Sequence, residues 1–266
     1  MIIRPDGSDL LLITQPDHAA LAGRLMTAWT HHGFPTRATR DRVLMAAALH
    51  DCEWEEWDAA PPVSPETGLP YDFMTAPLAH KQGVWPRAVD RLAARDPYVG
   101  ALVAQHALTV YRRYAHDPDW HAFFADLERR RDDLFSLSTT PPADAGAATD
   151  AATDAAEAAP TWPVVDPSQF LQDYVIVGLG DLFSLVYCSG WHDPYLMEDY
   201  RAILHGERLE ITPDPFDGAT VPLEVSARRI PARRYASDAD LRATLARAPV
   251  ERLAGVASGP LPAPNS

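Results

Sequence analysis

Residues 39–58 read TRDRVLMAAALHDCEWEEWD, and this stretch decides how the rest of the chain is interpreted. A helix is predicted to begin at Thr39–Asp41. Its apolar side chains recur at helical spacing and lead directly into a polar dipeptide: Val43, Leu44, Ala47 and Ala48, then His50-Asp51. Neighbouring residues on a helix diverge by about 100°. The pair can therefore serve two adjacent metal ions, with Asp51 as the bridging ligand.

The same combination of polar side chains and apolar helical patterns recurs along the chain. Six side chains lie inside such patterns or at helix starts: His18, His50, Asp51, His80, His106 and Asp181. Burying so many polar groups is costly without partners, and a metal site supplies a partner for all of them. Imidazole and carboxylate ligands suit Fe, Mn, Ni or Zn better than Ca or Mg. The sequence predicts one or two divalent transition metals and no organic cofactor.

The pattern divides the chain into four parts. These are a β-hairpin at residues 1–15, a helical core at 16–136 and 164–191, a disordered linker at 137–163, and a β-containing extension at 192–266. We expect a mainly α protein, a helical bundle with a small β-sheet formed by the N-terminal hairpin and the C-terminal strands. The linker is predicted because it is rich in Ala, Asp, Thr and Pro and almost without large apolar residues.

The composition of the chain argues against several classes of partner. The formal charge of −14 over 266 residues disfavours nucleic acid, whose phosphates need a basic face. No window approaches the roughly 18 uncharged apolar residues of a membrane span, and the N-terminus lacks the features of a signal peptide. The two cysteines, Cys52 and Cys188, lie in apolar patterns and favour buried thiols over a disulfide. We expect a soluble, cytoplasmic protein without nucleic-acid or membrane partners, and the oligomeric state stays open.

The order of His18, His50-Asp51 and Asp181 resembles the H…HD…D signature of the HD-domain superfamily of metal-dependent phosphohydrolases, over residues 16–191. His80 and His106 are similar to the additional histidines of its binuclear branches. The segments QPDHAALAG, HDCEWEEWD, PETGLPYDF and DLFSLVYCSGW resemble an uncharacterised bacterial family, domain of unknown function 3891. The resemblance implies an HD-like helical bundle and hydrolysis of a phosphoester by a metal-activated water, with a small, phosphorylated molecule as substrate.

One departure weakens the phosphate interpretation. Many HD phosphohydrolases carry a lysine three residues after the aspartate, and this chain has Trp54 there. The same ligand pattern also resembles the diiron oxygenases of the superfamily, exemplified by inositol oxygenase, which act on a small polar molecule. A third hypothesis is an HD-like protein that binds a ligand without turnover.

Several further residues are candidates for contact with a substrate. Trp54 and Trp57 share a helix face with His50 and can form an aromatic wall, or simply pack in the core. Gln15 can orient His18. Cationic side chains that can replace the missing lysine, or that are merely solvated, are Lys81, Arg112 and Arg113. The Pro-rich loop at 58–77 carries two possible lid residues, Tyr71 and Phe73.

Overall fold

The structure is a computed structural model that describes residues 1–139 and 165–260. Most of the predicted linker at 137–163 lies outside the described residues. At its near end, helix α6 (His121–Thr139) continues through Thr139, past the start of the predicted linker.

The remaining helices follow the apolar patterns of the sequence. They are α1 (Gln15–Thr27), α2 (Arg40–Leu49), α3 (Glu55–Ala59), α4 (Leu78–Ala93), α5 (Pro97–Val110), α7 (Pro167–Ser189) and α8 (Asp238–Arg247), with 3-10 turns η1 (His31–Thr36), η2 (Cys52–Trp54), η3 (Arg112–Tyr114) and η4 (Pro118–Trp120). Capping residues fix where they begin. The Thr14 hydroxyl accepts a hydrogen bond from Asp17 N at α1, and the carboxylates of Asp96 and Asp166 cap α5 and α7 in the same way.

In the described residues seven strands form one mixed sheet, in the order β1-β2-β6-β7-β5-β4-β3. The strands are β1 (Ile2–Asp6), β2 (Asp9–Ile13), β3 (Tyr195–Met197), β4 (Tyr200–His205), β5 (Arg208–Thr212), β6 (Val221–Pro231) and β7 (Val250–Ser258). Within this described sheet, neighbours are antiparallel except β5 and β7, which are parallel. Strand β2 joins the N-terminal hairpin to the C-terminal strands, with Leu10 opposite Ile230.

The expectation of a mainly α, HD-like bundle with a small sheet is wrong, because the sheet is a full layer of an α/β fold. Strands β3, β4 and β7 are the elements that the sequence pattern missed. Strand β4 (YRAILH) and strand β7 (VERLAGVAS) carry charged residues or a glycine, which weaken the alternation that predicts a strand. Their pairing partners, and not their local sequence, determine their conformation.

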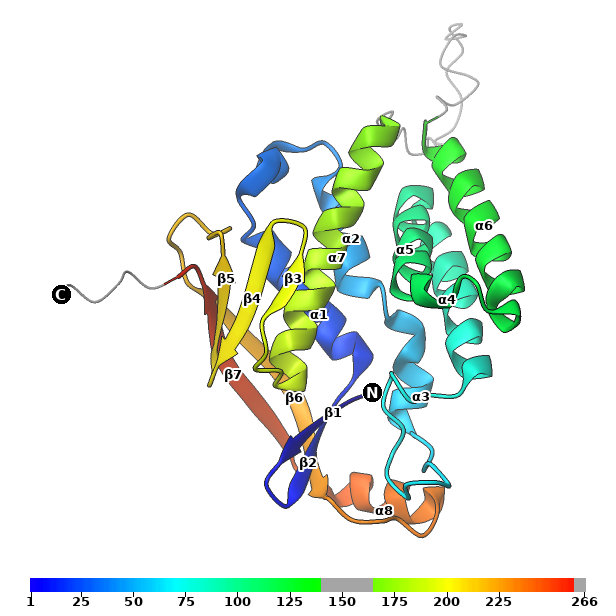
Figure 1. Cartoon of the computed structure of the whole chain (residues 1–266), viewed down its shortest axis with the longest axis vertical. Helices are drawn as coiled ribbons and strands as arrows, with labels where there is room; N and C mark the ends of the chain where they lie inside the picture. The colour runs from blue at the N-terminus through cyan, green and yellow to red at the C-terminus, as the bar shows by residue number, and fades with distance from the viewer. Residues whose placement is uncertain (140–164, 261–266) are drawn as a thin grey trace, which may run out of the picture.

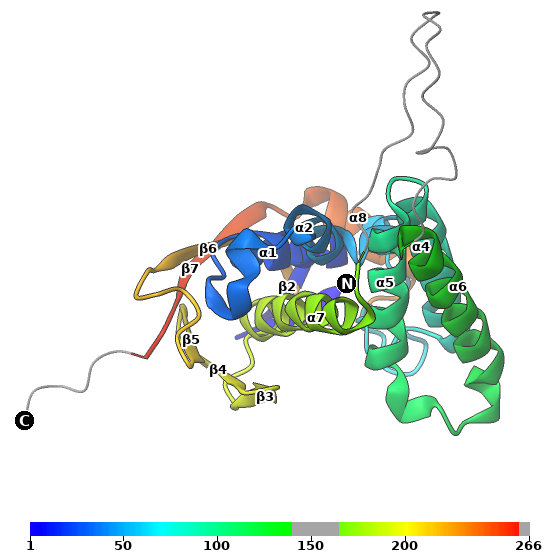
Figure 2. The same cartoon turned by 90° about the horizontal axis from the view of Figure 1, so that it is seen from above.

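Helices α1, α2 and α4 to α7 form two groups on one side of the sheet, whereas α8 packs on the other face, where Leu241 and Leu245 contact the cluster that contains Leu10 and Leu12. Helix α1 contacts β6, and α7 contacts strands of the other half, so these two helices lie directly against the sheet (Figure 1). Seen from above, α1, α2 and α7 lie between the sheet and a second group made of α4, α5 and α6 (Figure 2). The middle group is therefore shielded on two sides, which suits it to hold buried polar groups.

Small residues let the middle helices approach closely. A Cβ atom on Gly23 of α1 would lie 2.6 Å from Ala48 Cβ of α2. One on Gly180 of α7 would lie 2.9 Å from Met26 Cγ of α1. Such distances are below normal contact, so glycine at both positions permits helix α1 to pack tightly against α2 and α7.

Helix α7 is the one helix of the described chain that is long and apolar enough to cross a membrane. In this structure 67% of its most apolar window is buried. Packing against the sheet on one side and helices on the other explains why it is apolar all round. This placement is consistent with a helix of the protein core.

Candidate metal centre

Four of the predicted ligands come together in the middle helical group. His18 lies on α1, His50 caps the C-terminus of α2 with Asp51 beside it, and Asp181 lies on α7. His18 and His50 are fully buried, and the side chains of Asp51 and Asp181 are 5% and 14% exposed. Asp181 thus lies on the most accessible side of the group.

The spacing of the four side chains fits a single ion. His18 Nε2 lies 2.9 Å from Asp51 Oδ2 and 3.7 Å from Asp181 Oδ1. His50 Nε2 lies 3.5 Å from Asp51 Oδ2 and 3.3 Å from Asp181 Oδ1. Metal–ligand bonds of about 2.1 Å place neighbouring ligand atoms about 3.0 to 3.4 Å apart, in octahedral or tetrahedral geometry respectively. The four nitrogen and oxygen atoms are therefore already at the separations that coordination requires.

The hydrogen bond at the other ring nitrogen of His50 determines its tautomer. His50 Nδ1 lies 2.9 Å from the Ala47 carbonyl oxygen, which can only accept, so Nδ1 carries the proton. Nε2 faces the carboxylates of Asp51 and Asp181, and when it gives up its own proton it directs a lone pair toward them. Nε2 is buried and has no hydrogen-bond partner in the described part of the chain. Lone pairs facing one another across such distances need a cation between them.

His18 shows the same arrangement. The Ser184 hydroxyl donates to the Asp181 carbonyl oxygen at 2.9 Å, so it must accept from His18 Nδ1, which lies 2.8 Å away. His18 Nε2 is then the lone-pair nitrogen that faces Asp51. Ligand histidines usually donate their second N–H to a carbonyl, carboxylate or water in this way.

The electrostatics of the group also indicate a missing cation. Burial by itself lowers the pKa of His50, but the carboxylates of Asp51 and Asp181 outweigh it and raise this pKa to about 10. Burial raises the pKa of Asp51, yet His50 and His18 hold it well below its usual range. The pKa of Asp181 is lowered in the same way, against the effect of burial. A positive charge, carried by a proton or by a metal, is strongly favoured here.

His106, on α5, lies beside this group. Its Nε2 is 3.7 Å from Asp181 Oδ2, and its ring centroid is 4.8 Å from that of His50. Two triads of potential ligands overlap, one formed by His18, His50 and Asp51 and the other by His50, His106 and Asp181. Because His50 Nε2 has a single lone pair, both triads describe one centre rather than two independent ones.

The structure does not group His80 with the other five predicted ligands. Its ring stacks on Trp57 with centroids 3.8 Å apart and meets the edge of Trp54 at 4.8 Å. Burial lowers the pKa of His80 to about 4, with further lowering by Arg87 and the Met1 amino group. No negatively charged group offsets this effect, so the surroundings of His80 are opposite in sign to those of His50.

The other predicted substrate contacts have partners outside the candidate centre, or are exposed. The Gln15 backbone N–H donates to Asp58 Oδ2 at 2.5 Å, while its side-chain oxygen has no partner in the described residues, so no contact with His18 is formed. The Lys81 ammonium donates to the Met74 carbonyl. Arg112 is exposed on η3. Arg113, in the same turn, places its guanidinium 4.8 Å from the Tyr114 ring centroid.

Sequence reasoning missed Ser184 and the Ala47 carbonyl, the groups that orient the two histidines. Ser184 follows Asp181 by one helical turn, so the pattern DLFS contained a signal for it. The carbonyl of Ala47 is a backbone atom and leaves no trace in the sequence. The role of Ser184 depends on the packing of α7 against α1, which brings its hydroxyl to His18.

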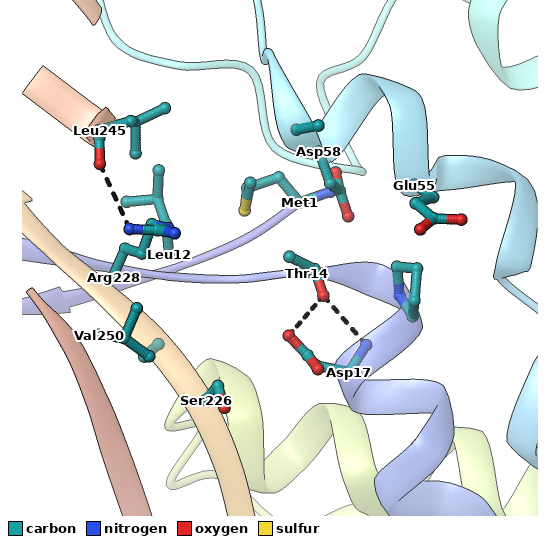
Figure 3. Close-up of a pocket in the computed structure, with 13 residues that line it drawn as sticks. Met1, Leu12, Thr14, Asp17, Glu55, Asp58, Ser226, Arg228, Leu245 and Val250 are labelled. Carbon is teal, nitrogen blue, oxygen red and sulfur yellow. Dashed lines mark hydrogen bonds and ion pairs between the residues drawn. The ribbon is translucent and has the colours of Figure 1, made fainter. Parts of the chain in front are cut away.

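A cavity of about 560 Å³ opens beside the N-terminal end of α1 (Figure 3). Asp17, Glu55 and Arg228 line it, and none of the predicted metal ligands does. At its upper edge in the picture the Met1 amino group lies 2.5 Å from Asp58 Oδ1. The cavity is therefore distinct from the candidate centre.

Comparison with protein families gives one match. Residues 1–232 match the family described as Protein of unknown function (DUF3891). The chain belongs to this family. All six predicted ligands of this DUF3891 protein fall inside the matched region, whereas α8 and β7 lie beyond it. Searches among curated proteins and solved structures give no match.

Proposed function

We propose that the chain is a metal-dependent hydrolase that cleaves a phosphoester in a small molecule. One observation carries the proposal: the buried lone pair of His50 Nε2 faces two carboxylates and has no hydrogen-bond partner in the described chain. Four ligand atoms at 2.9 to 3.7 Å from their neighbours support a divalent transition ion, Fe, Mn, Ni or Zn. His106 is the proposed additional ligand.

The order of the ligands along the chain supports a relationship of this centre with that of the HD-domain superfamily. His18, the pair His50-Asp51, and Asp181 occur in that superfamily's order and meet in space. The likeness concerns the centre and its helices, since the sheet gives the chain a different overall fold class.

Each residue has a defined part in the proposed reaction. When bound, the metal lowers the pKa of a coordinated water toward neutrality and polarises the phosphoryl oxygen. Asp51 and Asp181 supply the negative charge that retains the ion. Ala47 and Ser184 hold His50 and His18 in the tautomers that present Nε2. Asp181, being the most exposed of the four, marks the side from which substrate reaches the ion.

The position of His80 favours the hydrolase over the diiron oxygenase. A second ion bridged by Asp51 would need both His80 and His106, and His80 instead packs against two tryptophans. A single ion suffices for hydrolysis, whereas a diiron reaction needs two. We place the activity in the cytoplasm, and the buried free thiols of Cys52 and Cys188 support that environment.

The test is elemental analysis of the full chain purified without chelators, followed by assays with a nitrophenyl phosphodiester. We expect about one equivalent of transition metal and nitrophenol release that depends on Mn, Ni, Fe or Zn and is lost in Asp51→Asn. Two equivalents of iron with a near-ultraviolet band that changes under oxygen would instead identify an oxygenase. If the protein contains metal but catalyses neither reaction, it is a ligand-binding protein. If it contains no metal, both enzymatic hypotheses are refuted.

A further inference from the structure

Three aromatic rings next to the candidate centre form what we call the indole cluster, Trp54 of η2, Trp57 of α3 and His80 of α4. His80 lies 4.8 Å from Trp54, at an interplanar angle of 71°, and stacks on Trp57 at 3.8 Å and 28°. Trp54 follows the predicted ligand Asp51 by three residues, about one helical turn, so the indole cluster begins directly after this ligand in the chain.

Each ring of the indole cluster has a nitrogen with unused hydrogen-bonding capacity. Trp54 Nε1, Trp57 Nε1 and His80 Nε2 are shielded from solvent, and within residues 1–139 and 165–260 none has a hydrogen-bond partner. Buried polar atoms are rarely left unpaired in folded proteins. Elsewhere in the described residues Trp29 Nε1 is also unpaired, and so are Trp85 Nε1 and His106 Nδ1, whose rings lie 5.6 Å apart, but only the indole cluster brings three such nitrogens together. Three such nitrogens on rings in mutual contact indicate that something other than the chain provides the acceptor.

The chemistry of the rings defines that acceptor. An indole N–H can only donate. His80 is neutral at pH 7, because burial, Arg87 and the Met1 amino group lower its pKa to about 4. The cluster therefore offers donors without a formal charge of its own. An oxyanion fits these conditions, whereas an ammonium group or an apolar ligand does not.

The position of Trp54 adds to this picture. It stands three residues after Asp51, and its side chain is buried at 2% exposure. An indole at this position directs a donor into the protein without burying an ammonium group, which would need a paired charge.

We infer that Trp54, Trp57 and His80 form an oxyanion-binding site that receives the phosphoryl oxygens of the substrate through uncharged N–H donors. This inference rests on the proposed hydrolase and specifies its substrate class as one with an accessible anionic phosphoryl group. Trp54 and Trp57 are binding residues in this scheme, and His80 serves the anion and not a second metal.

The test measures binding of inorganic phosphate to the metal-loaded full chain by calorimetry. Trp54→Phe and Trp57→Phe keep the ring and remove only the N–H. Each should weaken phosphate binding about tenfold or more, as expected for loss of a hydrogen bond to a charged group, with metal content unchanged. Trp29→Phe is the matched control, because it removes an equally buried, unpaired N–H elsewhere, and its phosphate affinity should stay within about twofold of wild type.

The outcomes separate this inference from the proposed function. No saturable phosphate binding by the wild type, or equal binding by both cluster variants, overturns the inference even if hydrolysis persists. Loss of metal in His80→Ala also overturns it, since His80 would then be a metal ligand. If phosphate binding depends on Trp54 and Trp57 but the protein has no phosphodiesterase activity, the oxyanion site is supported and only the proposed hydrolase activity is refuted.

Discussion

His50 and His80 make an instructive pair. Both were predicted as metal ligands, and both have a shielded Nε2 atom without a hydrogen-bond partner in the described chain. Burial lowers the pKa of each, but Asp51 and Asp181 reverse this for His50, whose pKa is raised to about 10. For His80, burial, Arg87 and the Met1 amino group all act in the same direction, and its pKa is lowered to about 4.

The difference teaches that neighbouring charges, and not residue type or helix placement, determine which ion a buried histidine serves. The group around His50 has excess negative charge and needs a cation. The indole cluster has unpaired donors, and in our proposal it binds an anion.

The largest expected effect comes from replacing each of the two histidines separately by alanine. His50→Ala should reduce bound metal to a small fraction of the wild-type content, whereas His80→Ala, the matched control, should retain it. Because a ligand present at a thousandfold excess over its Kd stabilises the folded state by about 4 kcal/mol, only His50→Ala should lose the metal-dependent part of thermal stability. Elemental analysis and calorimetric melting, with and without chelator, measure both. Equal metal content in the two variants would remove the distinction between the clusters.

An intermediate effect is expected from Ser184→Ala. The substitution removes the acceptor for His18 Nδ1–H, so the ring loses its fixed tautomer and orientation. Loss of such supporting groups typically lowers metal affinity about 10- to 100-fold. Competition with a chromophoric chelator gives the affinity directly. Ser189→Ala is the control, since Ser189 is buried on the same helix with an unpaired hydroxyl in the described chain, and an equal loss there would contradict the role of Ser184.

The smallest effect is a pH dependence. Below a pKa of about 10, His50 of the metal-free protein holds a proton where the ion would bind. Metal binding must displace it, so the apparent affinity should rise about tenfold per pH unit between pH 7 and 9 and flatten above 10. Calorimetry in two buffers of different ionisation enthalpy counts the released proton. An affinity that does not change with pH would show that His50 is already neutral.

The sequence was sufficient for most of the helices because their apolar residues recur every three to four positions and their caps are explicit, as at Thr14 and Asp96. It was also sufficient to group His18, His50, Asp51, His106 and Asp181 as candidates. It failed for the size of the sheet. The pairing of the N-terminal hairpin with a C-terminal strand was expected and occurs as β2 with β6, but strand β5 pairs with β7 across a long sequence separation that no local pattern records.

The sequence also failed to separate His80 from the other histidines. Its spacing from His50 is similar to that between His18 and His50, and spacing alone does not give the direction in which a side chain points. That direction follows from the contact of α4 with η2, which places His80 against two tryptophans. The direction of the His80 side chain is therefore determined by tertiary packing and not by helical periodicity.

Strand β7 lies at the middle of the sheet, with β6 on one side and β5 on the other. Without it the sheet consists of two three-stranded pieces, β1-β2-β6 and β5-β4-β3, each with an open edge. Since β7 follows all the other strands along the chain, a ribosome delivers both edges before the strand that joins them. Closure of the sheet is thus a late event in synthesis, and until then two unpaired edges are available for pairing with other chains.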